Sequence, residues 1–240
     1  MSQSYSFSQK ALAMAVHVFT ASGIVCGFYA LVAISGNHFM EAMYLLIVCQ
    51  IIDGIDGTFA RLWRVKEVLP WMNGSTIDYV VDFCTYAVIP IFLIYQADLM
   101  PTMLLTHFAC VCMLLVSAIY YGKEGMVSED NYFVGFPVLW NLAAFWLYFV
   151  NGPELAWYNF ILVIILSVLH FVPLKFSYPS RRNQFFYVDL LATVTLLVSS
   201  AWIIYNHANG HSSLTLKIIW HLCIVWYVGA AVLVTIRGKA

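Results

Sequence analysis

Long apolar runs recur along the whole length of this chain, and short polar or turn-forming stretches such as GNHF, QADLMPT and NGPEL separate them. Each run comes close to the roughly 20 residues that an α-helix needs to cross the hydrocarbon core of a bilayer. The pattern predicts about eight membrane-spanning helices, at approximately 11–35, 40–61, 76–97, 102–122, 134–150, 156–174, 186–206 and 216–236.

Composition agrees with this pattern. Hydrophobic residues make up 62% of the chain and charged residues 10%, whereas a soluble domain carries roughly 25% charged residues. No soluble domain, tail or linker is left between the predicted spans, so we expect an all-α, polytopic integral membrane protein with a single domain over residues 1–240. The N-terminal segment MSQSYSFSQK does not resemble a cleaved signal peptide, and we expect the first span to stay in the mature protein.

The distribution of Lys and Arg predicts the orientation, because cytoplasmic loops are enriched in these residues. If the N-terminus is cytoplasmic, only Lys217 falls on the opposite side of the membrane. The pattern therefore predicts that both termini and the 62–75 loop are cytoplasmic. The basic residues on that side are Lys10, Arg61, Arg64, Lys66, Lys123, Lys175, Arg181, Arg182, Arg237 and Lys239.

Four aspartates lie at the edges of the second and third predicted spans, where each charge costs at least ~2.5–3.5 kcal/mol on insertion scales. Asp53 and Asp56 are three residues apart and Asp78 and Asp82 are four apart, so each pair occupies one face of its helix. The two helices are antiparallel, and a rise of ~1.5 Å per residue places Asp53 and Asp82 at a similar depth, about 12 Å below the loop. We expect all four carboxylates to face one small volume near the cytoplasmic surface.

Such a cluster should either hold protons or bind cations. Oxygen ligands alone favour hard ions such as Mg²⁺ or Mn²⁺, and two such ions ~3.5–4 Å apart are suited to phosphoryl substitution. Gly54, Gly57 and Ala60 leave room for a ligand beside this face, and Arg61 adds a cation at its mouth. The alternative is an ordinary interfacial helix end, which explains loop arginines well but does not explain four aspartates at this spacing.

The chemistry-bearing residues form a pattern of eight fixed positions: Asp53, Asp56, Gly57, Ala60, Arg61, Gly74, Asp78 and Asp82. This pattern resembles the signature of the CDP-alcohol phosphotransferases, integral membrane enzymes that join an alcohol to a CDP-activated group and release CMP. The common form of that signature has eight residues between Arg and Gly, whereas this chain has twelve. The longer spacing and the segment YFVGFPVLWN at 132–141 resemble the bacterial branch that condenses CDP-diacylglycerol with free choline.

The resemblance implies roles for the individual residues. Asp53, Asp56 and Asp78 would bind metal, as two ions of Mn²⁺ or Mg²⁺. Asp82 would bind metal and act as the general base. The residues that would line the CDP part are Gly57, Ala60, Arg61 and Gly74. The resemblance also implies a homodimer in a bacterial inner membrane, an active site that faces the cytoplasm, and CDP-diacylglycerol, choline and membrane lipid as partners, with no nucleic acid.

The acceptor alcohol is left open by the residues themselves. A quaternary ammonium group is held by aromatic faces and acidic charge, and the candidates near the motif or in the loop before the fifth predicted span are Tyr79, Phe83, Tyr86, Tyr120, Tyr121, Tyr132, Phe133, Phe136 and Trp140. Glu129 and Asp130 could add charge, or could be solvated loop acids. Asp189 is a further intramembrane acid without an evident partner.

Two other functions are compatible with the sequence. An enzyme of the same family could use serine, glycerol 3-phosphate or inositol phosphate, although a phosphorylated acceptor calls for more basic residues near the site than this chain offers. A transporter with acidic residues along its pathway is the other alternative. No internal repeat of the spans is apparent, which argues against a transporter.

Overall fold

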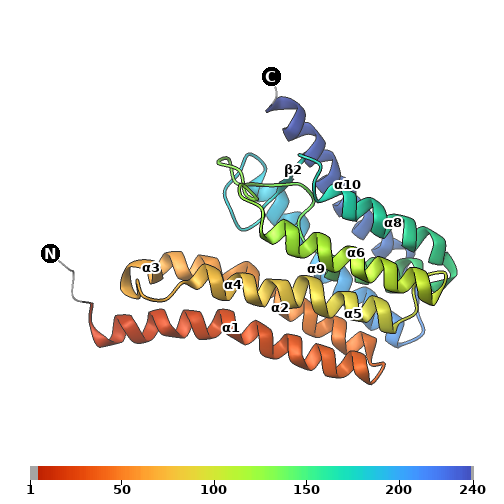
Figure 1. The fold of residues 1–240 in the computed structure, drawn as a ribbon, viewed down its shortest axis with the longest axis horizontal. Coiled ribbons are helices and arrows are strands. Elements are labelled where there is room, and N and C mark those ends of the chain that lie inside the picture. Colours follow the sequence, from red (N-terminus) through yellow and green to blue (C-terminus); the bar gives the residue numbers. More distant parts are fainter. Residues whose placement is uncertain (1–4, 239–240) are drawn as a thin grey trace.

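The structure, a computed structural model, describes residues 5–238, so Lys239 and the two extreme ends of the chain lie outside the described residues. Long helices dominate this part of the chain (Figure 1). In the first half of the chain, five helical segments pack against the long helix α1 (Phe7–Ser35). They are α2 (Phe39–Leu62), the short α3 (Val65–Val68), α4 (Gly74–Asp82), η1 (Phe83–Val88) and α5 (Ile89–Gln96).

The second half of the chain completes the bundle. Its helices are α6 (Met103–Tyr121), α7 (Trp140–Phe145), η2 (Trp146–Asn151), η3 (Pro153–Leu155), α8 (Ala156–Leu169), α9 (Phe186–Ala208) and α10 (Leu214–Arg237). Helix α6 packs on α8, α9 packs on α10, and contacts of α5 with α7 and of α2 with α9 join the two halves.

In the described part of the chain, six helices are long and apolar enough to cross a membrane, and they coincide with six of the predicted spans. They are α1, α2, the continuous segment Gly74–Gln96, α6, α9 and α10. The other two predictions, 134–150 and 156–174, fall on a bent pair, Trp140–Asn151 and Pro153–Leu169, whose axes differ by 104°. Counted as one span, this pair brings the total to seven.

The prediction of one helix over 134–150 is wrong in its first third. Residues 135–139 are not helical, and α7 begins only at Trp140. Gly135 has a φ of 95°, and a Cβ atom there would lie 2.0 Å from the carbonyl oxygen of His170. Only glycine fits such a close approach to the backbone, and Pro137 lacks the N–H that a helix interior needs. Apolar composition alone does not reveal these two constraints.

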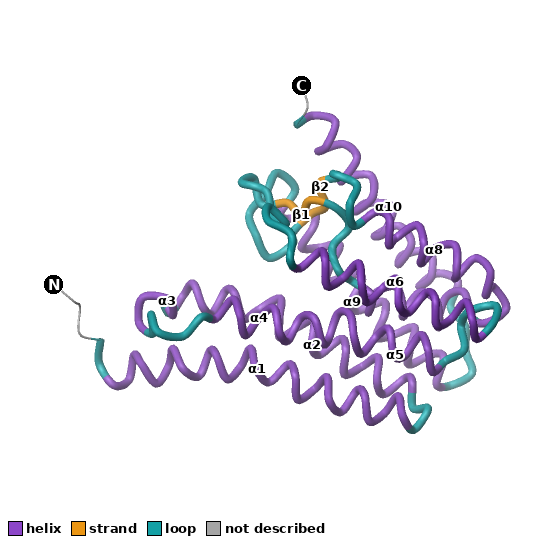
Figure 2. Tube along the Cα trace, viewed as in Figure 1, coloured by secondary structure: helices purple, strands orange, loops and turns teal. Residues whose placement is uncertain are grey.

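A two-stranded antiparallel sheet is a second departure from the all-α expectation (Figure 2). Strand β1 (Tyr132–Val134) precedes the bent pair and β2 (Lys175–Ser177) follows it, with Tyr132 opposite Ser177. The Trp140 ring stacks on the His170 ring at a centroid distance of 5.3 Å. The chain therefore leaves for the bent pair and returns from it at the same end of the molecule.

Local sequence explains how the acidic helix starts and how it continues. Asn73 caps α4, because its side-chain oxygen accepts hydrogen bonds from the amides of Ser75 and Thr76. Directly after Asp82 the helix widens into the π-helical segment η1. Such segments are rare and often lie at functional sites. The widened turn brings Tyr86 of η1 against Asp53 of α2.

Candidate active site

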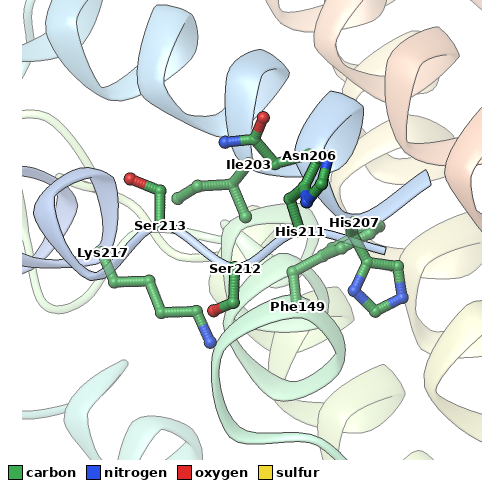
Figure 3. A pocket seen from close by; sticks show the side chains of 8 residues that line it. All are labelled: Phe149, Ile203, Asn206, His207, His211, Ser212, Ser213 and Lys217. Carbon is green, nitrogen blue, oxygen red and sulfur yellow. The ribbon is translucent and has the colours of Figure 1, made fainter. Parts of the chain in front are cut away.

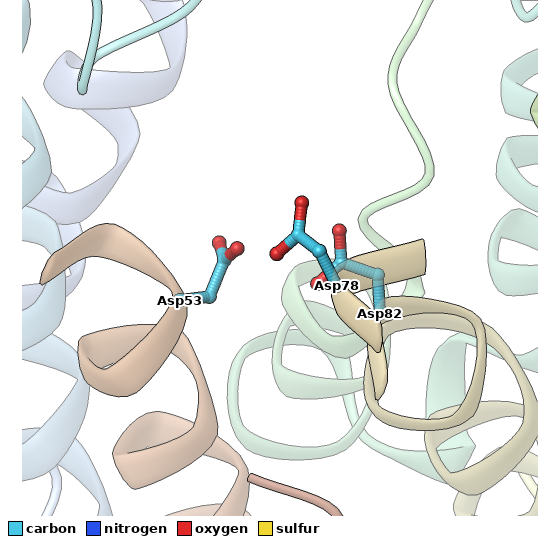
Figure 4. A group of neighbouring side chains, drawn as sticks. All are labelled: Asp53, Asp78 and Asp82. Carbon is cyan, nitrogen blue, oxygen red and sulfur yellow. The ribbon is translucent and has the colours of Figure 1, made fainter. Parts of the chain in front are cut away.

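Three of the four predicted aspartates come together. One carboxylate oxygen from each of Asp53, Asp78 and Asp82 lies within 4.8 Å of the other two. Figure 4 shows Asp53 on α2 directed across a gap toward Asp78 and Asp82 on α4. Sequence spacing thus placed this carboxylate group correctly on the facing sides of two helices.

Asp56 does not belong to this group of three. It is 6% exposed and interacts with Thr20 on α1, so its carboxylate lies toward α1. The expectation that all four carboxylates converge is therefore met by three of them in this structure. A residue three positions along a helix is turned by about 300°, which leaves Asp56 about 60° away from Asp53 around the axis.

The carboxylates are held close together by their surroundings. The Tyr86 hydroxyl donates a 2.7 Å hydrogen bond to Asp53 Oδ2, and the side chains of Asp53 and Asp82 are within hydrogen-bonding reach of each other. Two carboxylates at this distance need a proton or a cation between them. Because all the donors are oxygen atoms, the group of Asp53, Asp78 and Asp82 could hold a hard divalent ion.

The four residues predicted to line the CDP part differ in their contacts. Arg61 Nη1 lies 3.3 Å from the position that a Cβ atom would take at Gly57, so these two residues share one surface. Ala60 packs against an apolar cluster that contains Val65 and Val68. At Gly74 a Cβ atom would lie 2.9 Å from the ring of His17, so this glycine gives α1 a close approach to α4.

The loop after β2 contacts Arg61 of the site, and the pattern of eight residues did not contain this loop. Arg61 donates a 3.5 Å hydrogen bond to the Ser180 carbonyl, and the Arg181 guanidinium lies 5.7 Å from the centre of the Tyr178 ring. Burial raises the pKa of the Tyr178 phenol, and the nearby carboxylates of Asp53 and Asp78 raise it further. Tyr178 and Arg181 therefore face the carboxylate group.

The remaining acidic candidates lie elsewhere. Asp189 is fully buried and accepts a 2.9 Å hydrogen bond from the Trp226 indole, which supplies the partner that the sequence did not reveal. Asp130 forms a 2.7 Å ion pair with Lys175, and the hydrogen bond from Lys175 holds the pKa of Asp130 below its usual range. Glu129 is exposed. None of the three belongs to the carboxylate group of the described residues.

A small hollow lies far from the carboxylates, at the turn between α9 and α10 (Figure 3). Its lining includes His207, His211 and Lys217. Among the described residues the two histidines do not form part of a metal-ligating group. Lys217 donates a 3.5 Å hydrogen bond to the Val150 carbonyl.

Comparison with known proteins places these residues in a family context. The family model described as CDP-alcohol phosphatidyltransferase matches residues 12–178, which is more than half of the chain. A phosphatidylcholine synthase of Pseudomonas aeruginosa is 37% identical over 198 residues, or 81% of each chain. One of Borreliella burgdorferi is 33% identical over 76% of this chain and 77% of the relative.

A phosphatidylcholine synthase of Mesorhizobium japonicum is 38% identical over 172 residues. That match covers 72% of this chain and 63% of the relative, so this chain spans just under two thirds of its length.

Proposed function

The chain belongs to the CDP-alcohol phosphatidyltransferase family, and on that premise we propose that it is a phosphatidylcholine synthase, which condenses CDP-diacylglycerol with choline and releases CMP. The observation that carries the proposal is the group formed by Asp53, Asp78 and Asp82, which stands where the family signature requires metal ligands. The twelve-residue spacing between Arg61 and Gly74 supports choline as the acceptor, together with the printed names of the relatives.

In the proposed reaction the choline hydroxyl attacks the phosphorus atom that bears diacylglycerol. The bond from this phosphorus to the oxygen of CMP breaks, and Asp82 accepts the hydroxyl proton. Divalent ions, Mn²⁺ or Mg²⁺, would supply charge neutralisation among the carboxylates and polarise the phosphate oxygens. Asp53, Asp78 and Asp82 would hold them, and we propose two ions with Asp56 as a further ligand.

Arg61 and Arg181 would bind the diphosphate from the cytoplasmic side of the carboxylates. Arg61 reaches the loop of Arg181 through the Ser180 carbonyl, so the two guanidinium groups border one opening. A guanidinium presents several N–H donors in a fixed plane that matches phosphate oxygens. We propose that the CDP part lies beside three small residues, Gly57, Ala60 and Gly74. Gly57 shares a surface with Arg61.

The orientation follows from the same residues. We propose that both termini are cytoplasmic and that the active site faces the cytoplasm of a bacterial inner membrane. Support comes from the bent pair, which returns to the end where it began, so that it adds no net crossing to the six long helices. The eight predicted segments then correspond to six full membrane spans and the two helices of the bent pair. We also propose that residues 1–240 form a single domain. The family resemblance further suggests that the protein is a homodimer.

The test is a CMP-release assay on the purified full chain in detergent with CDP-diacylglycerol and Mn²⁺. Choline, serine, glycerol 3-phosphate and inositol phosphate are added one at a time. We expect choline alone to raise CMP release well above the rate without alcohol. Release that depends on one of the other alcohols would leave the family assignment intact and overturn the choice of choline.

A further inference from the structure

The position of the acceptor's charged group follows from the proposed reaction, on which this inference rests. In choline only two carbon atoms separate the hydroxyl from the quaternary nitrogen. If Asp82 accepts the hydroxyl proton, the trimethylammonium group must lie beside the same carboxylates. This group has no hydrogen-bond donor, so aromatic faces and negative charge are what can hold it.

One side of the carboxylate group is unsuited to the ammonium group because two arginines, Arg61 and Arg181, already lie there. The guanidinium of Arg181 lies over the Tyr178 ring, 5.7 Å from its centre. The Phe133 ring stacks on Tyr178 at a centroid distance of 4.4 Å. Both contacts cover the Tyr178 ring, and the charge on this side attracts phosphate and repels ammonium.

Aromatic rings that contact neither arginine also border the carboxylate group. Tyr121 ends α6, and its ring centroid lies 5.9 Å from that of Tyr79 and 6.0 Å from that of Phe83. Tyr79 follows Asp78 in the chain and Phe83 follows Asp82, so these rings border the carboxylates. Tyr121 itself is half-buried and interacts electrostatically with Asp82, more than with Asp53 or Asp78.

The nearby lysine does not compete for this surface. Lys123 is two residues after Tyr121, but its ammonium donates a 3.0 Å hydrogen bond to the Val134 carbonyl and lies over the ring of Tyr120. Tyr120 is buried, and its ring packs on His170. The surface of Tyr121 therefore combines aromatic faces with negative charge.

The other aromatic candidates have different partners. Tyr86 is buried, and its hydroxyl is committed to Asp53. Phe136 and Trp140 pack around the ring of His170, where they join the two ends of the bent pair. Tyr132 is buried in β1, and its hydroxyl accepts a hydrogen bond from the Gln184 amide. Among the aromatic candidates named from the sequence, these contacts leave Tyr121, Tyr79 and Phe83 beside the carboxylates.

We propose that Tyr121, flanked by Tyr79 and Phe83, binds the quaternary ammonium group of the acceptor alcohol beside Asp82. The site is then divided by charge. Arginines and Tyr178 serve the diphosphate on one side, and uncharged rings serve the acceptor on the other. Selection of choline over less methylated amino alcohols follows, because a methylated cation loses little hydration when it enters an aromatic site.

The experiment compares Tyr121→Leu with Tyr178→Leu as a matched control, since both tyrosines border the same carboxylates. The choline KM and the affinity for CDP are measured for each variant. Tyr121→Leu should raise the choline KM by about 3- to 30-fold and leave CDP affinity within about twofold. Tyr178→Leu should weaken CDP binding and leave the choline KM within about twofold.

Two further variants keep the test independent of folding. Tyr121→Phe keeps the ring and should retain a choline KM near that of the wild type. Tyr79→Leu alters a side chain that is 45% exposed and should raise the choline KM by about two- to fivefold. The ratio of kcat/KM for choline to that for dimethylethanolamine should fall in Tyr121→Leu.

An unchanged choline KM in both Tyr121→Leu and Tyr79→Leu would overturn the proposal, as would a rise confined to Tyr178→Leu. The wild-type protein separates this failure from that of the proposed function. Choline-dependent CMP release by the wild type shows that choline is the acceptor, whatever the variants do. Its absence, with release triggered by another alcohol, would reject the proposed function and this inference with it.

Discussion

Asp82→Asn separates the proposed base from the metal ligands. The substitution keeps the size of the side chain and removes one proton acceptor and one negative charge. Loss of general base catalysis should lower turnover by roughly 10²–10⁴-fold, which corresponds to roughly 3–5 kcal/mol in the activation free energy.

The structure also predicts what the substitution does to stability. Asp82 has an oxygen within 4.8 Å of oxygens of both Asp53 and Asp78. Two unit charges at that separation repel by about 3 kcal/mol at an effective dielectric constant of about 20. Removal of one charge should therefore not lower the melting temperature of the chelator-treated protein, and we expect a small rise.

The assay pairs turnover with the affinity for CDP, and Asp78→Asn serves as the matched variant. Asp82→Asn should bind CDP within about threefold of the wild type in the presence of Mn²⁺. Asp78→Asn should lose both turnover and CDP affinity, because the metal links the protein to the diphosphate. Near-normal turnover in Asp82→Asn, or a loss of CDP affinity as severe as in Asp78→Asn, would refute the role of Asp82.

Four other outcomes follow from the same structure. Turnover should fall to background after EDTA treatment and return with Mn²⁺ or Mg²⁺, since the carboxylates can ionise together only with positive charge between them; turnover that survives chelation excludes the metal proposal. Arg181→Gln should weaken CDP binding by roughly 10-fold or more, whereas Arg182→Gln should have little effect; an unchanged CDP affinity in Arg181→Gln would contradict its proposed role at the diphosphate. A cysteine placed at Lys66 should resist a membrane-impermeant thiol reagent added to intact cells while one at Asn209 reacts, and the reverse pattern contradicts the orientation. Gly135→Ala should lower the free energy of unfolding by at least about 1–3 kcal/mol because of its positive φ and its contact with the backbone; an unchanged melting temperature contradicts that reasoning.

The sequence was informative where one physical requirement dominates. A spanning helix needs a long apolar run, so α1, α2, α6, α9 and α10 follow the predicted ranges closely. The carboxylate group was predictable for a related reason, since an aspartate in an apolar helix is costly and helical spacing fixes the face on which it lies. Asp53, Asp78 and Asp82 met this expectation.

The features that sequence reasoning missed depend on contacts between distant segments. The strands β1 and β2 lie more than 40 residues apart, and neither is long enough to give a periodic signal. Tyr178 and Arg181 follow β2 in the chain, so their place at the site depends on the pairing of this strand with β1. Asp56 turned toward Thr20 for a similar reason, because the packing of α1 on α2 decides the environment of that face.

The most direct test of the central claim is identification of the product. Purified protein is incubated with CDP-diacylglycerol, Mn²⁺ and choline that carries nine deuterium atoms on its methyl groups, and the lipids are analysed by mass spectrometry. The account predicts phosphatidylcholine that retains all nine deuterium atoms, formed in a one-to-one ratio with CMP and at a rate roughly 10²–10⁴-fold lower in Asp82→Asn. CMP release without labelled lipid, or labelled lipid formed equally well by Asp82→Asn, would contradict it.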